Sequence, residues 1–470
     1  MSIKSIIFLK QRVSSLPEVV SGFRNNVEGS IEFNSSGKLL VTGTLNGDYT
    51  SPSGSSPAYS QWAALIDLNG NYELNIGVMG GVSQIADAKI LPNGDYALLC
   101  ATRSMSWPAP FFTVARVTPT GTQVWAKQIS SGGFDDSLGY TSLAVDSVTG
   151  DVVVYAKWSN AELWLAKLEF ATGQLIWNVS RDTQSTADGD VVIKNLFVVG
   201  GDIYATGYWY EIASSQTVCA AWKFNSLGVM QWCQTLNMRP TFNAADAAIT
   251  PTGELVLLGY TSDGSGDTWR LAKLTNTGAI AFQRSVASAD LPSGWFTGHS
   301  RYKLALSPDG SIYIAATPHE SATNPNTFIA KMTSAGVAVT ARVLTNTYNI
   351  GAENANRRSA LTVSSTGDVF VATGYGEASY DVESAIFRLK GDLLTPTTFT
   401  AGSWAPYALS VTNTNSPTFT TTVTTDISLT SRTDTDLGNT KIFTDVTPFV
   451  TTTSLAVPVS LYYSPGNSYL

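Results

Sequence analysis

Short apolar runs alternate with short polar turns along most of the chain, and glycine closes these turns. One set of turn glycines recurs about every fifty residues, a spacing typical of repeat architectures. Its members are Gly70, Gly121, Gly173, Gly228, Gly278, Gly336 and Gly391. A second set lies upstream in each repeat and comprises Gly37, Gly94, Gly150, Gly201, Gly253, Gly310 and Gly367. Each repeat therefore holds two strand–turn–strand units, which predict one four-stranded sheet.

Residues 85–128 show the pattern most clearly. The run before Pro92–Gly94 predicts a first strand, and the runs after it predict three more, at Tyr96–Ala101, Phe112–Val117 and Val124–Lys127. Glycine in the tight turns supplies the positive φ that such connections require. Seven repeats of this kind predict an all-β protein, a seven-bladed β-propeller of four-stranded antiparallel blades. A β-solenoid is the competing architecture, but its coils are shorter than these repeats.

The seventh repeat has no regular fourth strand, because Asp392–Pro396 interrupts the pattern after the last turn. Residues 5–11 resemble the fourth strand that is predicted at residues 123–128. We therefore predict that the N-terminal segment supplies the outer strand of the last blade, so that both free edges of the ring are paired. Residues 398–408 are the competing candidate for this strand.

The chain divides into three predicted regions. Residues 1–24 form the closing strand, residues 25–410 form the propeller, and residues 411–470 form a C-terminal β-rich extension. The extension is rich in threonine and poor in aliphatic residues, and alternation at Phe419–Val423 and Ser454–Tyr463 predicts strands there. It is either an extended β appendage or a segment that becomes ordered only on a partner.

The amino-acid composition limits the classes of partner that the chain can bind. Charged residues make up 14% of the 470-residue chain, the formal net charge is −8 and the isoelectric point is near 4.9. A negative surface repels the phosphate backbone of nucleic acids and anionic bilayers alike, so we expect no nucleic-acid partner. No apolar run is long enough to cross a bilayer, so we also expect no membrane insertion.

The three cysteines, Cys100, Cys219 and Cys233, all lie in apolar runs that resemble strands. An odd number of such residues favours buried free thiols in a reducing compartment, and a single disulfide pair is the alternative. The first fifteen residues have too short an apolar core for a secretory signal. We therefore expect the chain to be made and folded in a cytoplasm.

Tryptophan recurs at one position of the repeat, shortly after the second turn glycine, as Trp125, Trp177 and Trp232. The segments at residues 119–125 and 171–177 place Thr-Gly just before the tryptophan. In this respect the chain resembles the PQQ-like propeller repeat. The resemblance implies a propeller in which these tryptophans dock one blade against the next. Quinoprotein dehydrogenases of that family also bring a secretion signal, calcium-binding acids and often an adjacent-cysteine pair, none of which we find, so we expect no cofactor.

A basic residue recurs at one position of the third strand. The set comprises Arg116, Lys167, Lys223, Lys273, Lys331 and Arg388. We interpret it as a structural feature, in which long side chains lie over a neighbouring blade and hold their charged ends in solvent or against a carboxylate. The alternative is a ring of cations for an anionic ligand.

Signals for enzyme chemistry are weak. Asp263–Asp267 has the oxygen donors of a calcium loop, but we interpret it as a flexible connection. His299 and His319 have no metal-ligand spacing, so we expect no metal site and no histidine-based triad. Acids and arginines that could form a glycosidase site occur on predicted loops, at Glu353, Arg357, Arg358, Asp381 and Glu383. No supporting motif accompanies them, so we expect no catalytic residues.

Long predicted loops combine tyrosine and tryptophan with serine, asparagine and glycine, a composition that suits contacts with sugars or protein surfaces. Solvent-exposed decoration is the alternative. The candidate binding residues are Tyr49, Tyr59, Trp107, Tyr208, Trp209, Tyr210 and His319.

Low charge and a Ser/Thr/Asn-rich β segment near the C-terminus resemble the composition of structural proteins of bacteriophage tails and fibres. We therefore expect a non-enzymatic virion component, made in the host cytoplasm, whose propeller binds another virion protein or a host-surface glycan. The first alternative is a cytoplasmic carbohydrate- or protein-binding propeller of a cell. The second is a propeller-fold polysaccharide hydrolase or lyase.

Overall fold

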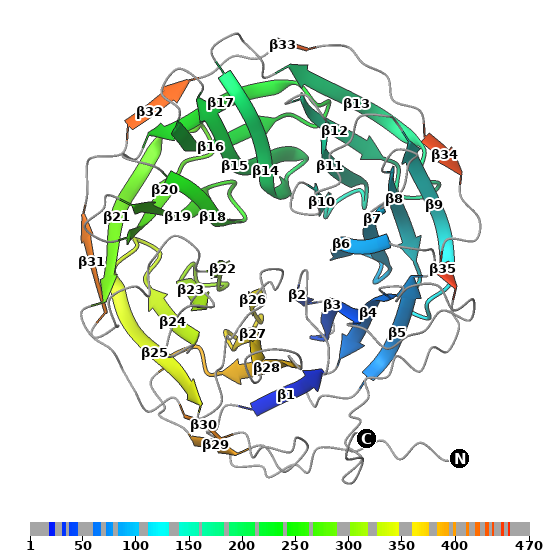
Figure 1. The fold of residues 1–470 in the computed structure, drawn as a ribbon. Coiled ribbons are helices and arrows are strands. Elements are labelled where there is room, and N and C mark those ends of the chain that lie inside the picture. Colours follow the sequence, from blue (N-terminus) through cyan, green and yellow to red (C-terminus); the bar gives the residue numbers. More distant parts are fainter. Residues whose placement is uncertain are drawn as a thin grey trace, which may run out of the picture.

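The computed structural model is a ring of β-sheets arranged around a central axis (Figure 1). Among the residues that it describes there is no helix. The structure describes residues 18–23, 31–33, 37–45, 60–66, 72–78, 83–102, 111–130, 141–158, 162–182, 188–211, 216–237, 242–262, 267–288, 301–317, 327–346, 360–375, 383–393, 398–400, 410–412, 419–423, 428–431, 435–436, 443–445 and 450–451.

Seven blades follow one another around the ring, and each blade extends from the axis to the rim. From the axis outward, blade 1 contains β2 (Ile31–Phe33), β3 (Leu39–Leu45), β4 (Ser60–Ile66) and β5 (Tyr72–Val78). Blade 2 contains β6 (Ser83–Ile90), β7 (Tyr96–Thr102), β8 (Phe111–Val117) and β9 (Gln123–Ser130). Blade 3 contains β10 (Thr141–Val145), β11 (Val152–Trp158), β12 (Glu162–Leu168) and β13 (Leu175–Asp182). Blade 4 contains β14 (Asp188–Val199), β15 (Asp202–Glu211), β16 (Gln216–Phe224) and β17 (Met230–Asn237).

The remaining three blades complete the circle in the same way. Blade 5 contains β18 (Phe242–Ile249), β19 (Leu255–Ser262), β20 (Asp267–Leu274) and β21 (Ile280–Ser288). Blade 6 contains β22 (Arg301–Leu306), β23 (Ile312–Thr317), β24 (Thr327–Met332) and β25 (Ala338–Asn346). Blade 7 contains β26 (Ala360–Val363), β27 (Val369–Tyr375), β28 (Glu383–Leu389) and β1 (Glu18–Phe23). All strand pairs within the blades are antiparallel, which confirms the predicted seven-bladed propeller.

The first turn of blade 2 shows why glycine recurs. The N–H of Gly94 donates to the carbonyl oxygen of Leu91 at 2.8 Å, and Gly94 has a φ of 89°. Only glycine reaches this backbone conformation without strain. The spacing of the glycines along the sequence therefore reports the spacing of the hairpins.

The last blade is closed by the N-terminal segment. Strand β1 pairs with β28 from Glu18 opposite Arg388 to Phe23 opposite Ser384. The segment that we predicted for this strand, residues 5–11, lies outside the described residues. The competing strand, β29 (Thr398–Thr400), pairs with β30 on blade 6 and takes no part in the sheet of blade 7.

The C-terminal extension forms a belt around the rim, in which short strands are added to the fourth strands in reverse blade order (Figure 1). We call this set of strands the belt. It consists of β30 (Ser410–Thr412) on β25, β31 (Phe419–Val423) on β21, β32 (Ser428–Ser431) on β17, β33 (Thr435–Asp436) on β13, β34 (Phe443–Asp445) on β9 and β35 (Val450–Thr451) on β5. The described strands of the predicted extension are therefore part of the ring, whereas residues 452–470, with the strand predicted at Ser454–Tyr463, lie outside the described residues.

The hydrophobic core lies between adjacent blades. Trp209 and Trp222 of blade 4 stack with their ring centroids 6.4 Å apart, and both pack in one cluster with Leu165 of blade 3. The three cysteines are buried and free, which confirms the predicted thiols. Burial raises the pKa of Cys100 and of Cys219 far above the ordinary thiol value, so neither is a reactive thiolate.

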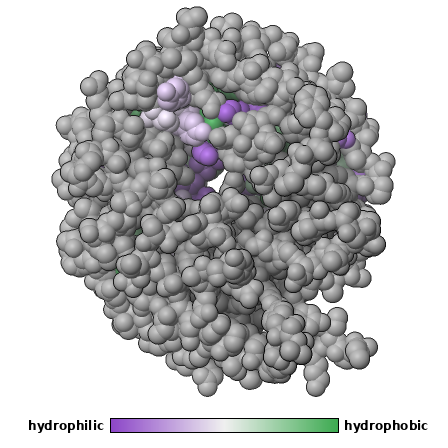
Figure 2. All heavy atoms as spheres, in the orientation of Figure 1, coloured by the Kyte–Doolittle hydropathy of each residue, from purple (hydrophilic) through white to green (hydrophobic). Residues whose placement is uncertain are grey.

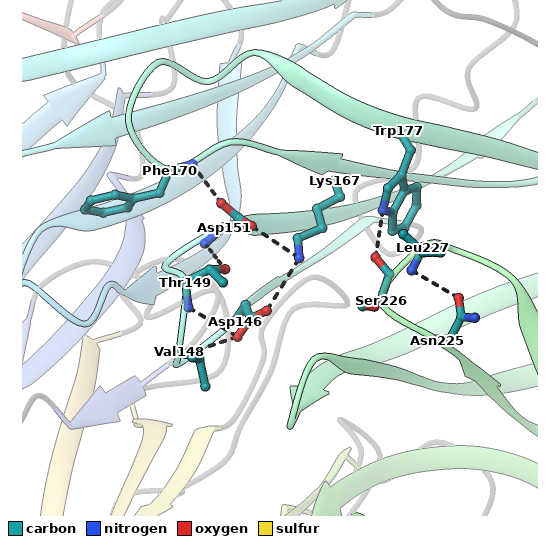
Figure 3. Close-up of polar contacts among 10 residues, drawn as sticks. All are labelled: Asp146, Val148, Thr149, Asp151, Lys167, Phe170, Trp177, Asn225, Ser226 and Leu227. Atoms are coloured by element: carbon teal, nitrogen blue, oxygen red, sulfur yellow. Dashed lines mark hydrogen bonds and ion pairs between the residues drawn. The ribbon is translucent and has the colours of Figure 1, made fainter.

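The recurring tryptophans connect neighbouring blades. The indole N–H of Trp125 in blade 2 donates to the carbonyl oxygen of Phe170 in blade 3 at 2.9 Å. The indole N–H of Trp177 donates to Ser226 at 3.0 Å (Figure 3), and that of Trp232 donates to Asn276 at 3.1 Å. Each bond ends on a turn of the following blade. The predicted docking role of these tryptophans is therefore confirmed.

We expect Trp177→Phe to destabilise the ring by about 1 kcal/mol, because the phenyl ring keeps the packing but loses the hydrogen bond to Ser226. Trp177→Ala should cost more, since the indole also packs about 3.1 Å from the position of a Cβ on Gly228. Urea unfolding of both variants measures the difference. A Trp177→Phe variant that loses no stability would show that the indole N–H contributes nothing.

Candidate functional site

The basic residues of the third strands are paired within their own blades. Lys167 lies 3.4 Å from Asp146 and 3.2 Å from Asp151 (Figure 3). The same pairing with an acid at the start of the second strand recurs in four other blades. These pairs are Arg116–Asp95 at 2.6 Å, Lys223–Asp202 at 2.8 Å, Lys273–Glu254 at 2.7 Å and Arg388–Asp368.

Two of these cations also reach the next blade. Arg116 donates to the carbonyl oxygen of Phe170 at 2.9 Å and lies 3.7 Å above the phenyl ring of the same residue. Lys331 donates to the carbonyl oxygen of Gly391 at 2.8 Å. The predicted blade-to-blade role therefore holds for Arg116 and Lys331. The alternative of a free cation ring is disfavoured, because carboxylates already neutralise five of the six positions.

A second polar set lies on the first strands, which surround the axis. In β6, β14 and β18 the register shifts by one residue just before Asp87, Asn195 and Asp246, respectively. A bulge of this kind turns a side chain away from the direction that regular alternation would give it. The same structural position therefore carries an acid or an amide in three blades.

These side chains bond to the backbone of the following blade. Asp87 accepts the N–H of Leu143 at 2.9 Å, and Asp246 accepts the N–H of Leu304 at 2.8 Å. With its amide oriented to satisfy both neighbours, Asn195 donates to Asp246 at 2.9 Å and accepts the N–H of Ala247 at 3.2 Å. We call Asp87, Asn195 and Asp246 the axial latch. Together they fasten blade 2 to blade 3, blade 4 to blade 5 and blade 5 to blade 6.

Two lysines lie beside the acids of the axial latch. Lys89 lies 3.5 Å from Asp87 with a quarter of its side chain exposed, and Lys303 lies 3.8 Å from Asp246. Glu32 of blade 1 accepts the N–H of Ile90 at 2.8 Å. Figure 2 shows strongly hydrophilic residues beside the opening at the centre of the ring. The axis is therefore polar, with acids and lysines side by side.

Burial controls the charge of two axial acids. It raises the pKa of Asp246 against the opposing effects of Lys303 and the N–H of Leu304. It also raises the pKa of Glu32, although Lys89 partly offsets the effect. Burial disfavours the charge on Lys89 too, but Asp87 and Glu32 together hold the pKa of Lys89 above its ordinary value. The acids thus serve as acceptors for backbone N–H groups, which is a structural role.

We expect the free energy of unfolding to fall as pH rises from about 4 through the raised pKa of Asp246. Over that interval the folded ring holds a proton that the unfolded chain has already lost. Asp246→Asn removes this titration. The stability difference between about pH 4.5 and pH 7 should therefore shrink by about 1.4 kcal/mol per unit of pKa shift, as measured by urea unfolding at the two pH values.

Asp309→Asn is the matched control with the opposite sign. The hydroxyl of Ser307 and the N–H of Ser311 hold the pKa of Asp309 below 3.8. The ionised carboxylate therefore contributes stability above that value, and the contribution is lost as pH falls. Because the two groups titrate on opposite sides of about pH 4, Asp309→Asn is measured between about pH 2.5 and pH 4.5, where it should flatten a rise in stability with pH, whereas Asp246→Asn flattens a fall above about pH 4.5. A change in the same direction would contradict the assignment for Asp246.

The aromatic binding candidates fall into two groups. Tyr208, Trp209 and Tyr210 lie on β15, where the tyrosines are half-buried and Trp209 is 2% exposed. The core position of Trp209 corrects its assignment as a contact residue, since a tryptophan stacked inside the blade has no surface to offer a partner. Tyr208 has the ammonium of Lys194 5.7 Å from its ring centroid. Tyr49, Tyr59, Trp107 and His319 lie outside the described residues.

Most of the weaker candidates lie outside the described part of the chain. Glu353, Arg357, Arg358, Asp381 and His299 lie outside it, whereas Asp267 and Glu383 each begin a strand. Among the described residues, no group of three or more histidine, cysteine, aspartate or glutamate side chains is placed to hold a metal ion. No helix among them is long and apolar enough to span a membrane.

The axial latch is what reasoning from the sequence missed. A usable signal exists, because Asp87 and Asp246 each lie seven residues before the first turn glycine of their blades, between alanines of the predicted first strand. An acid in the first strand of a repeat must be buried near the axis, and a buried acid requires a partner. The bulge that supplies that partner has no sequence signature of its own.

Comparisons with known proteins concern the fold. No known family matches the chain, and no curated protein matches its sequence. Among solved structures, the polysaccharide lyase Uly1 aligns with a TM-score of 0.49 and 11% identity, over 78% of this chain and 90% of the lyase. Drosophila Semaphorin 1a (extracellular domains 1–2) aligns with a TM-score of 0.44 and 9% identity, over 80% and 88%. Quinohemoprotein alcohol dehydrogenase from Comamonas testosteroni aligns at 0.40 and 10%, over 82% and 78%.

Proposed function

We propose that this protein is a non-enzymatic docking scaffold, a structural component of a virion such as a phage tail or fibre, whose propeller binds another virion protein or a host-surface glycan. The observation that carries the proposal is the covered rim. The belt adds a strand to blades 1–6, and β1 forms the outer strand of blade 7. Segments from near both ends of the chain are thus used to fasten the ring.

Contacts between blades occur at three distances from the axis, which supports a role under mechanical load. Near the axis, Asp87 bonds to the backbone of blade 3. At the turns, Trp125 bonds to the backbone of blade 3. At the rim, the belt adds strands β34 and β33 to blades 2 and 3. Blades 2 and 3 are therefore joined near the axis and at the turns and both carry the belt at the rim, which suits a part that must keep its shape within an assembly.

The described ionisable groups favour structure over chemistry. The third-strand cations face acids of their own blades, and the axial acids accept backbone N–H groups. Catalytic acids and bases need a free site beside the reacting atoms. For contact with a glycan or protein, Tyr208 and Tyr210 are the described candidates, because each is half-buried at one end of β15.

The proposal is tested by determining whether the chain is part of purified virus particles. Particles from a culture that produces the protein are purified on a density gradient and probed with an antibody against the ring. We expect the chain in the particle fraction, and we expect its gene among genes for other particle proteins. Detection in the soluble fraction alone, or turnover of a polysaccharide by the purified chain, would overturn the proposal.

Binding is tested separately with a glycan array and with particle proteins as probes. Tyr208→Ala and Tyr210→Ala should weaken binding. Because both side chains are half-buried, each variant should also lower the unfolding midpoint, so binding is compared at a temperature at which both variants are folded. Lys38→Ala on blade 1 is the matched surface control. Binding that is unchanged in both tyrosine variants would exclude this end of β15 as the contact surface.

A further inference from the structure

The belt is held unevenly. Strand β31 pairs with β21 along five residues, and β32 pairs with β17 along four. On blades 2, 3 and 1 the pairing shortens to three residues for β34 and two each for β33 and β35. The belt is therefore anchored on blades 4 and 5. Over the described residues it is lightly attached on blades 1–3, and also on blade 6, where β30 pairs with β25 along two residues.

Main-chain bonds hold the belt at these blades. The last three belt strands have the sequences TD, FTD and VT, which contain one large apolar residue and one valine. Such short strands have no core of their own, so they persist only on an existing sheet edge. Edge pairing through the backbone depends little on the identity of the side chains.

We propose that the outer edges of β5, β9 and β13 form an exchange surface that accepts β33, β34 and β35 from a second copy of this chain. The occupant is identified by what already lies on these edges. Every copy carries the same three strands and the same three edges, so an exchanged belt repeats the register seen within one copy. Exchange of an identical element needs no new interface chemistry.

Exchange between copies also keeps the sheet edges covered, whereas release of the last belt strands alone would expose them. A copy whose last belt strands leave blades 1–3 exposes the edges of three sheets, and such edges aggregate unless they are covered. A second belt covers them at once. The exchanged strands then link the two copies at the rim. Each further strand pairs at a high effective concentration once the first one holds the two copies together. This inference concerns the isolated ring and does not depend on the proposed virion role.

The test uses two full-length variants, Gln128→Cys on β9 and Thr444→Cys on β34, which are register partners. Directly opposed residues in an antiparallel pair are close enough for a disulfide, and the native cysteines are buried. The two variants carry different tags, are co-expressed, and are purified through both tags in succession. After mild oxidation we expect a disulfide between residues 128 and 444 of different chains, seen as a band of twice the monomer mass and identified by peptide mass spectrometry.

Two further variants make the outcome decisive. A double variant with both cysteines in one chain shows that the pair can close. Ala287→Cys with Thr420→Cys, register partners on β21 and β31, is the matched pair on the anchored part of the belt, and split between two chains it should give no link. A 128–444 link found only inside single chains, with no product recovered through both tags, would overturn the proposal.

Discussion

Gly173→Ala is expected to destabilise the ring by about 2–4 kcal/mol, of which about 1–2 kcal/mol is backbone strain and the remainder is overpacking. Gly173 has a φ of +69°, and a Cβ there would lie 2.7 Å from two ring atoms of Trp125 in the preceding blade. The indole cannot move aside freely, because its N–H is bonded to Phe170. Urea unfolding followed by tryptophan fluorescence measures the loss.

Gly367→Ala separates the two causes. This glycine has a φ of +84°, and a Cβ there would meet nothing within 4 Å. The control should therefore lose only the strain, about 1–2 kcal/mol. Equal losses in Gly173→Ala and Gly367→Ala would mean that the contact with Trp125 does not constrain the junction between blades 2 and 3.

The same arrangement recurs at consecutive junctions. Rings of Trp177, Trp232 and Phe282 lie against the positions where Gly228, Gly278 and Gly336, respectively, would carry a Cβ, at 3.1, 3.0 and 2.8 Å. The phenylalanine side chain has no N–H, and at that junction Arg284 donates instead to the carbonyl oxygen of Ala335 at 2.9 Å. Gly173, Gly228, Gly278 and Gly336 are therefore required twice, by the turn itself and by the aromatic ring of the previous blade.

This double requirement explains which parts of the fold were visible in the sequence. Hairpins are formed by residues that are close together in the sequence, so the spacing of the turn glycines was sufficient to predict the blades. The docking of Trp125 was predicted as well, because the PQQ-like repeat shares its position. The partner of that tryptophan was not predicted, since Gly173 and Phe170 are brought to it only when neighbouring blades pack. The equivalent role of Phe282 was not predicted either. At that junction Phe282 supplies the ring against Gly336 and Arg284 supplies the hydrogen bond.

The terminal segments are harder to place because their registers depend on the edges of blades that are distant in the sequence. Strand β1 has the sequence EVVSGF, which carries no clear alternation, whereas residues 5–11 match the expected outer strand more closely. The belt strands are two to five residues long, below the length at which a hydrophobic period can be recognised. Their positions are set by the fourth strands of the blades rather than by their own sequences.

Removing the belt should cause the largest change in behaviour. A chain that ends after Leu393 loses every belt strand, and we expect concentration-dependent aggregation together with a lower midpoint of thermal unfolding. The loss of equilibrium stability should be modest, about 1–3 kcal/mol, because hydrogen bonds of about 1 kcal/mol each are offset by the entropy of ordering an extended segment. Light scattering and thermal unfolding over a range of protein concentrations measure the two effects.

A chain that ends after Thr451 keeps the belt and is the matched control, so it should scatter no more light than the full chain. A third chain tests the cause: the Leu393 truncation with Gln128→Lys and Gln234→Lys places charges on two uncovered fourth strands, β9 and β17. Lysine on an exposed edge opposes strand pairing between molecules. Aggregation should therefore fall while the unfolding midpoint stays low. If the lysines leave aggregation unchanged, the belt contributes through stability alone and protection of the edges is not its role.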